Sequence, residues 1–327
     1  MEKLITKFSS NILESIKIAS KYSLSKPINE INSIVICGMG GSGIGGKLVS
    51  QWLEKELSVP VYLAQDYELP SFVDKQSLVI ASSYSGNTEE TLYSIQEAKT
   101  RGAHIIGITT GGKLAEFCAS SGYDCMLVPG GNPPRTALAF SLGQLLSILT
   151  SHGFCSNDRL LEFEKSALLL NESISEIKTR ASELALFLKD KFILIYAASN
   201  YEAVAIRARQ QINENGKMLC AHHLIPEMNH NELVGWGGGD DRFAAVFIDS
   251  LDLNERNLKR FIFSKEYIST KTAHIFTIKA KGNSMIERSI YLIHLVDWAS
   301  LYLAELNKVD AMEINVINDL KNQLSEL

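Results

Sequence analysis

The sequence has no excess of positive charge and no long hydrophobic run, and both absences narrow what the protein can bind. Its formal net charge is −5 over 327 residues, with the two signs mixed along the chain. Without a basic stripe or tail, we expect no nucleic-acid partner. The sequence also has no run of about 18 apolar residues, so we expect no membrane partner.

Cysteine is sparse and shows no paired spacing. The five cysteines are odd in number and none belongs to a CxxC pair: Cys37, Cys118, Cys125, Cys155 and Cys220. This usage predicts reduced, buried thiols. The first twenty residues alternate apolar and polar types at helical spacing, without the apolar block of a signal peptide. We therefore expect a cytoplasmic protein.

The first half of the chain alternates short apolar strands with helices. Strands are expected at Ser33–Cys37, Val61–Ala64, Leu78–Ser82, His104–Thr109 and Cys125–Val128. Helices are expected at Gly46–Glu54, Glu89–Thr100, Leu114–Ser120 and Thr136–Thr150. Continuous apolar strands that alternate with helices predict a parallel sheet covered on both faces.

The second half repeats this alternation. Strands are expected at Phe192–Ala197, Ala244–Ile248 and His274–Ile278, and helices at Arg159–Lys189, Glu202–Asn213, Asn254–Phe263 and Ser284–Asn307. At 46% hydrophobic residues, the chain can bury two cores of ordinary size. We predict an α/β fold with two αβα sandwich domains, at residues 1–155 and 156–327.

A glycine-rich loop, GMGGSGIGG at residues 38–46, follows the first expected strand. Glycines let a backbone approach an anion closely, and the start of the next helix attracts negative charge. The loop also fits the G-x-G-x-x-G pattern of dinucleotide-binding proteins, in which Asp66 would bind the ribose. From this loop alone, a dinucleotide, a sugar phosphate and tight packing without a ligand all stay open.

A second loop, SSYSGNTEET at residues 82–91, follows the third expected strand. Its hydroxyl groups surround a glycine and can converge on three phosphate oxygens. A helix N-cap at Asn87 or Thr88 would explain one hydroxyl but not a cluster of them. The two loops together favour a phosphate monoester, and the residues expected to bind it are Gly40, Gly41, Ser42, Ser83, Ser85 and Thr88.

With these motifs in view, the sequence resembles the SIS (sugar isomerase) domain family, and within it the bifunctional phosphoglucose/phosphomannose isomerases. Five segments carry the resemblance, in order over most of the chain: GMGGSGIGG at 38–46, SSYSGNTEET at 82–91, NPPRTA at 132–137, INENGK at 212–217 and PEMNHNE at 226–232. The family pattern near the C-terminus has prolines after a Val-Asp pair, whereas this chain has Ala311 and Met312 after Val309-Asp310.

The resemblance implies two SIS domains with Rossmann-like or flavodoxin-like parallel sheets, a homodimer, and neither a metal nor another cofactor. It implies a hexose 6-phosphate substrate in central carbohydrate metabolism. The reaction would be a reversible aldose–ketose isomerisation of glucose 6-phosphate and fructose 6-phosphate, extending to mannose 6-phosphate. The proton would pass between C1 and C2 through a cis-enediolate.

Such chemistry needs a base, a cation for the enediolate oxygens and a group that opens the sugar ring. Glu214 is the expected base. Arg135, presented after two prolines, would stabilise the developing negative charge. The resemblance implies that His230 opens the ring and reaches the active site from the partner subunit. It also implies a C-terminal lysine, for which Lys308 is the nearest candidate.

Three alternatives remain at this point. The first is a metal site, because metal-ligating residue types lie close together in the sequence at His222, His223, His230 and Glu232. Their spacing matches no common ligand motif. A sugar-phosphate-binding SIS regulator without catalytic activity is the main alternative function. An NAD-dependent oxidoreductase is the third, and a change in nicotinamide absorbance would reveal it.

Overall fold

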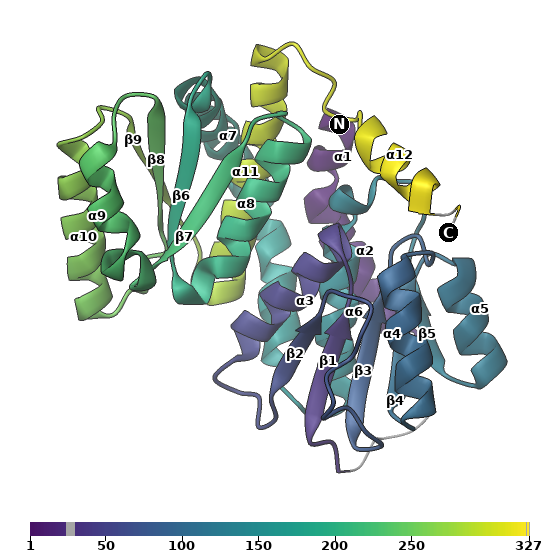
Figure 1. Cartoon of the computed structure of the whole chain (residues 1–327). Coiled ribbons are helices and arrows are strands. Elements are labelled where there is room, and N and C mark those ends of the chain that lie inside the picture. The colour runs from purple at the N-terminus through teal and green to yellow at the C-terminus, as the bar shows by residue number, and fades with distance from the viewer. Residues whose placement is uncertain (24–29, 325, 327) are drawn as a thin grey trace. The chain divides into compact units, whose positions relative to one another are not determined.

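The structure, a computed structural model, describes residues 1–23, 30–324 and 326, which form two compact units (Figure 1). The N-terminal unit comprises Thr6–Asn171 and Ser284–Glu287, and the C-terminal unit comprises Met1–Ile5, Glu172–Asn283 and Arg288–Leu327. The chain passes from one unit to the other inside a long helix, α7 (Asp158–Leu188). Our domain boundary at residues 155 and 156 lies in the loop before this helix and stays a prediction.

The N-terminal unit contains a five-stranded parallel sheet with the order β2-β1-β3-β4-β5. This order is the flavodoxin-like one. The strands are β1 (Ser33–Cys37), β2 (Val61–Ala64), β3 (Ser77–Ser82), β4 (His104–Thr109) and β5 (Asp124–Leu127). Strands β1 and β3 are buried along their whole length, as expected for central strands covered on both faces.

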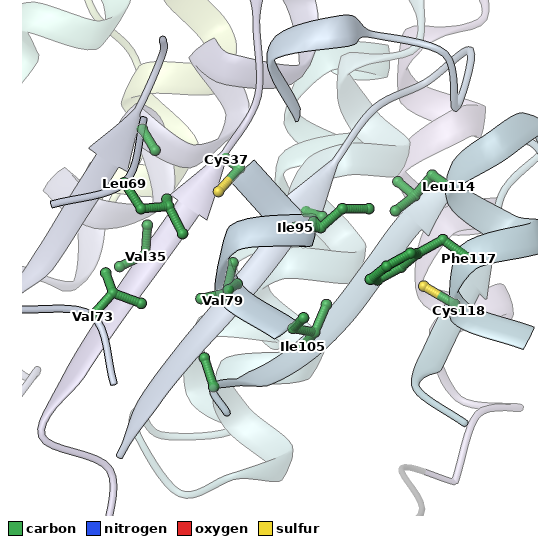
Figure 2. Packing of buried hydrophobic residues seen from close by; sticks show 14 residues of the cluster. Val35, Cys37, Leu69, Val73, Val79, Ile95, Ile105, Leu114, Phe117 and Cys118 are labelled. Atoms are coloured by element: carbon green, nitrogen blue, oxygen red, sulfur yellow. The ribbon is translucent and has the colours of Figure 1, made fainter. Parts of the chain in front are cut away.

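Helices cover both faces of this sheet (Figure 1). They are α2 (Phe8–Ala19), α3 (Gly40–Leu53), α4 (Glu89–Thr100), α5 (Gly112–Ser121) and α6 (Leu138–Ser151), while a short α1 spans Glu2–Thr6. Side chains alternate along a strand, so Val35 and Cys37 join the core cluster with Ile95 of α4 and Phe117 of α5 (Figure 2). Ile36 points to the other face, where its side chain would be 2.8 Å from a Cβ added at Gly46 of α3.

The C-terminal unit contains a four-stranded parallel sheet with the order β7-β6-β8-β9. Its strands are β6 (Phe192–Ala198), β7 (Cys220–Ile225), β8 (Phe243–Asp249) and β9 (Ile275–Lys279). Its helices are α8 (Glu202–Glu214), α9 (Glu232–Gly235), α10 (Glu255–Ser269), α11 (Met285–Leu306) and α12 (Asn315–Leu324). A second core cluster joins Tyr196 and Phe247 of the sheet to Trp236 and to Phe261 of α10.

The α/β prediction with parallel sheets is confirmed, and several details differ from the expectation. Helix α3 begins at Gly40, inside the glycine loop, rather than at Gly46. Strand β7 was not expected, because His222 and His223 interrupt its apolar pattern on a partly exposed edge strand. Helices α9 and α12 were not expected either. Among the described helices, none is both long and apolar enough to cross a membrane.

Candidate active site

The two predicted phosphate loops lie side by side because they follow neighbouring strands. Strands β1 and β3 pair in parallel, so Gly38 after β1 and Ser82 at the end of β3 come to the same edge of the sheet. A Cβ added at Gly38 would lie 2.8 Å from the carbonyl oxygen of Ser82, which means that the two backbones touch. The carboxyl edge of an open parallel sheet is where α/β proteins bind their ligands.

The first loop turns directly into helix α3. Gly40 has a φ of +50°, in the left-handed region that favours glycine, and it is the first residue of the helix. The first amides of a helix have no acceptor in a preceding turn, so the N–H groups of Gly40 and Gly41 are available to an anion. The positive end of the helix dipole lies at the same place.

The hydroxyl groups of the second loop bond to one another and to the loop backbone. Ser83 Oγ and Thr88 Oγ1 are 2.8 Å apart, and the Asn87 amide donates to Ser85 Oγ at 3.2 Å. Thr88 occupies the N-cap position of α4, but its side chain makes no capping bond there. The capping alternative therefore does not account for the Thr88 hydroxyl. Ser83 is fully buried and Ser85 is exposed.

The turn that carries Arg135 packs against the first loop. Arg135 lies in a 3₁₀ turn, Pro134–Thr136, and is only 3% exposed. A Cβ added at Gly41 would lie 3.0 Å from the Pro134 carbonyl oxygen and 3.2 Å from the Arg135 nitrogen. A cavity of about 10 Å³, enough for one water molecule, lies here and is lined by Gly41, Ser42, Ser82, Tyr84, Ile108, Val128, Pro134, Ala137 and Ser141. The N-terminal unit thus brings the Arg135 turn together with both predicted phosphate loops.

In the C-terminal unit, Glu214 is the last residue of α8 and is half-buried. The segment after it is tied to the end of α11. Lys217 Nζ donates to the carbonyl oxygens of Glu214 and Glu313, both at 2.6 Å, and Asn307 Nδ2 donates to the Gly216 carbonyl at 2.9 Å.

Lys308 lies two residues after α11, is exposed, and has a φ of +56°. The hydrogen bonds from Lys217 and Asn307 hold its segment next to the end of α8. The structure therefore brings together the segments that carry Glu214 and Lys308. An open depression of about 480 Å³ lies along the same segments, lined by Lys189, Asp190, Gly216, Lys217, Met218, Leu306, Asn307 and Val309.

A buried polar strip joins α8 to α11 beneath Glu214. Arg207 Nη2 donates to both carboxylate oxygens of Asp297, at 3.0 and 3.2 Å, and these side chains are 2% and 8% exposed. Burial raises the pKa of Asp297, and this effect outweighs the opposing charge of Arg207. About two turns further on, just past the end of α8, Asn215 Nδ2 donates to Ser300 Oγ at 2.9 Å. These contacts fix the end of the helix that carries Glu214.

His230 is exposed and ends a 3₁₀ turn, Glu227–His230, that follows β7. The next helix, α9, is anchored to the sheet through Glu232. Tyr196 OH donates to Glu232 Oε1 at 2.5 Å, and His223 Nδ1 lies 2.6 Å from Glu232 Oε2. Trp236 Nε1 donates to Tyr196 OH at 2.8 Å, which extends the chain of hydrogen bonds into the core.

Glu214 and His230 lie at opposite ends of the same sheet. Glu214 precedes β7 and His230 follows it, and the strand has six residues. At about 3.3 Å per residue, the strand alone separates its two ends by roughly 17 Å. Within one C-terminal unit, the predicted base and the predicted ring-opening histidine therefore do not meet.

The geometry of β7 separates the side chains of the residues considered as metal ligands. His222 and His223 are consecutive on β7, so their side chains point to opposite faces, and His223 pairs with Glu232. Among residues 1–23, 30–324 and 326, no group of three or more histidine, cysteine, aspartate or glutamate side chains is arranged to hold a metal ion.

The sequence matches two domain families and several known proteins. Residues 28–120 match the SIS domain, and residues 177–324 match the bacterial phospho-glucose isomerase C-terminal SIS domain. The bifunctional phosphoglucose/phosphomannose isomerase of Caldicellulosiruptor bescii is 38% identical over 326 residues, which cover 97% of this chain and 96% of that protein. The chain belongs to the bifunctional phosphoglucose/phosphomannose isomerase family.

Membership of this family identifies the chain as an enzyme, and a further relative carries the same name while another carries a different one. The bifunctional phosphoglucose/phosphomannose isomerase of Aquifex aeolicus is 35% identical and covers 93% of each chain. The D-glucosamine-6-phosphate 4-epimerase of Sulfolobus acidocaldarius is 34% identical over 253 residues, 75% of this chain and 79% of that protein. A solved structure is also similar: the C-terminal domain of glucosamine-fructose-6-phosphate aminotransferase from Francisella tularensis, with a TM-score of 0.77. The match covers 95% of this chain and 96% of that one, at 16% sequence identity. At this identity, the similarity supports the fold alone.

Sequence reasoning on this family member missed the residues that hold its predicted site in place. Tyr84 lies between two of the predicted phosphate-binding serines and bonds to three other segments. Arg207 and Asp297 are 90 residues apart and lie in helices that read as ordinary amphipathic segments. A charged residue on the apolar face of each helix was the available signal, since such charges are rarely buried without a partner.

Proposed function

We propose that this protein catalyses the reversible aldose–ketose isomerisation of hexose 6-phosphates, interconverting fructose 6-phosphate with glucose 6-phosphate and mannose 6-phosphate. The observation that carries the proposal is the packing of the Arg135 turn against the two phosphate loops, in a chain of this family. The phosphate would bind at Gly40, Gly41, Ser42, Ser83, Ser85 and Thr88. Its binding energy would position the distant carbons C1 and C2 for reaction.

The proposed reaction moves one proton and no hydride, so it uses neither nicotinamide nor flavin. Glu214 removes a proton from C1 or C2 and returns it to the other carbon. Arg135 stabilises the negative charge that develops on the enediolate oxygens. His230 transfers a proton between the ring oxygen and the hydroxyl during ring opening, and Lys308 assists at the ring oxygen.

We further propose that the active site is completed by a second copy of the chain, in a cytoplasmic homodimer. The separation of Glu214 from His230 by the length of β7 supports this proposal. If both residues serve one substrate molecule, the histidine must come from another subunit. The exposure of His230 is consistent with a role at such an interface.

A coupled assay on purified protein tests the substrate assignment. Fructose 6-phosphate and mannose 6-phosphate are each incubated with the protein without added cofactor, and the glucose 6-phosphate or fructose 6-phosphate formed is then measured with coupling enzymes in quenched samples. We expect turnover of both. No turnover of either substrate, with binding retained, would support the regulator instead. A parallel reaction with glucosamine 6-phosphate tests the epimerase activity named for the Sulfolobus relative.

Mixing two inactive variants tests the shared site. Glu214→Gln and His230→Ala are each expected to lose most activity as homodimers. After subunit exchange, half of the dimers contain one copy of each variant, and each such dimer has one intact site and one doubly altered site. The mixture should recover about a quarter of the wild-type rate. No recovery after demonstrated exchange would show that both residues act from the same subunit.

A further inference from the structure

Tyr84 connects four segments of the N-terminal unit through its polar groups. Its N–H donates to Ser42 Oγ at 3.2 Å, and its carbonyl accepts from the Thr110 amide at 3.0 Å. Its hydroxyl donates to the Pro129 carbonyl at 2.9 Å and accepts from the Asn132 amide at 3.3 Å. One residue of the second phosphate loop is thus bonded to the first loop, to the segment after β4, and to the segment that leads to Arg135.

The two contacts of the hydroxyl both fall on the segment that leads to Arg135. The segment leaves β5 at Val128, whose amide donates to the Thr109 carbonyl at 2.9 Å, and reaches the 3₁₀ turn at Pro134. Prolines 133 and 134 restrict the backbone immediately before Arg135. With Tyr84 OH holding it at 129 and 132, and Gly41 packed against it at 134 and 135, the turn has little freedom to move.

The Tyr84 hydroxyl has no free proton to donate to a substrate. A tyrosine hydroxyl has one proton to donate, and here it goes to the Pro129 carbonyl. Replacing the hydroxyl by hydrogen would leave this carbonyl and the Asn132 amide without that partner, while the backbone bonds of Tyr84 to Ser42 and Thr110 would remain. The hydroxyl and the phosphate loops can therefore be tested separately.

We propose that Tyr84 is a positioning residue: its hydroxyl holds the 129–136 segment so that the Arg135 guanidinium meets the enediolate, and it acts through Arg135 rather than on the substrate. The inference rests on the proposed function, in which Arg135 stabilises the transition state. A small displacement of a group that acts only in the transition state lowers kcat, whereas the affinity for the phosphate is set by the loops.

The first test is Tyr84→Phe, which removes only the hydroxyl. We expect kcat for fructose 6-phosphate to fall roughly 10- to 100-fold, while KM and the inhibition constant of inorganic phosphate stay within about twofold. Tyr93→Phe is the matched control, because Tyr93 is 58% exposed and its ring contacts Tyr67 in the same unit. Its kcat should equal that of the wild type. Loss of inorganic phosphate binding in Tyr84→Phe would contradict the proposal, since the hydroxyl would then hold the loops or the fold as a whole.

The second test is a double-mutant cycle with Arg135→Lys. If Tyr84 acts through Arg135, adding Tyr84→Phe to Arg135→Lys lowers kcat by less than about twofold. If the two losses multiply, Tyr84 acts independently and the proposal is wrong. Failure of the proposed function looks different: Arg135→Lys would then retain the wild-type kcat, or the wild type would not turn over hexose 6-phosphates at all.

Discussion

The buried pair Arg207–Asp297 predicts a large and asymmetric effect of charge removal on stability. Arg207→Met keeps most of the side-chain volume but leaves Asp297, which is 8% exposed, without the guanidinium that contacts both its oxygens. Breaking a buried pair in this way costs about 3–5 kcal/mol of unfolding free energy. We expect urea unfolding at pH 7 to show a loss of this size.

Removing both charges should largely reverse that loss. The double variant Arg207→Met/Asp297→Leu has no uncompensated charge, and replacing such a pair with apolar groups is often neutral or stabilising by 1–4 kcal/mol. Lys259→Met is the control, because the Lys259–Glu255 contact at 2.9 Å is exposed on both sides and should leave the urea midpoint unchanged. A single variant as stable as this control, or a double variant as unstable as Arg207→Met, would refute the reasoning.

Two further predictions concern acid stability and the second phosphate loop. Burial lowers the pKa of His294 to about 4, so its contribution to stability is complete above the unfolded-state pKa of about 6.5 and is lost as the pH falls toward 4. The wild type should lose about 1.5 kcal/mol from this group between pH 6.5 and 5, and denaturant titrations of His294→Gln should lack that part of the loss. Gly86→Ala would place a Cβ 1.8 Å from the Gly111 carbonyl oxygen at a φ of +71°, so we expect a lower melting temperature and a KM raised at least about tenfold. Gly122→Ala is the control, because Gly122 has the same left-handed backbone (φ +72°) and no atom lies within 4 Å of an added Cβ. If Gly122→Ala raised KM as much as Gly86→Ala, the clash at Gly111 would not be the cause.

The order of strands and helices could be predicted because this fold buries whole strands. Ser33–Cys37 and His104–Thr109 are continuous apolar runs, and the structure gives both strands the predicted bounds. Strand β7 could not be predicted in the same way. It lies at the edge of its sheet, where partly exposed positions accept His222 and His223.

The candidate site could be predicted only where its residues lie in local motifs. The two loops and the Arg135 turn are short segments with unusual composition, and the parallel pairing of β1 and β3 explains why the loops meet. The contacts of Tyr84 depend on how segments about 25 to 48 residues apart pack together, which no local pattern encodes. The roles of Glu214, His230 and Lys308 came from the family resemblance. These roles, and those of Arg135 and of the phosphate-loop residues, stay predictions.

The central claim, proton transfer through an enediolate with Glu214 as the base, is tested most directly by isotope incorporation. Fructose 6-phosphate is converted in D₂O, and the glucose 6-phosphate formed is examined by NMR for deuterium at C2. We predict deuterium at C2 in part of the product with the wild type, because the Glu214 carboxyl exchanges some of the abstracted proton with D₂O before returning it. We predict almost no product from Glu214→Gln, although that variant should still bind inorganic phosphate. A wild-type rate in Glu214→Gln would contradict the account, and so would product without deuterium when turnover is slowed enough for the carboxyl to exchange its proton.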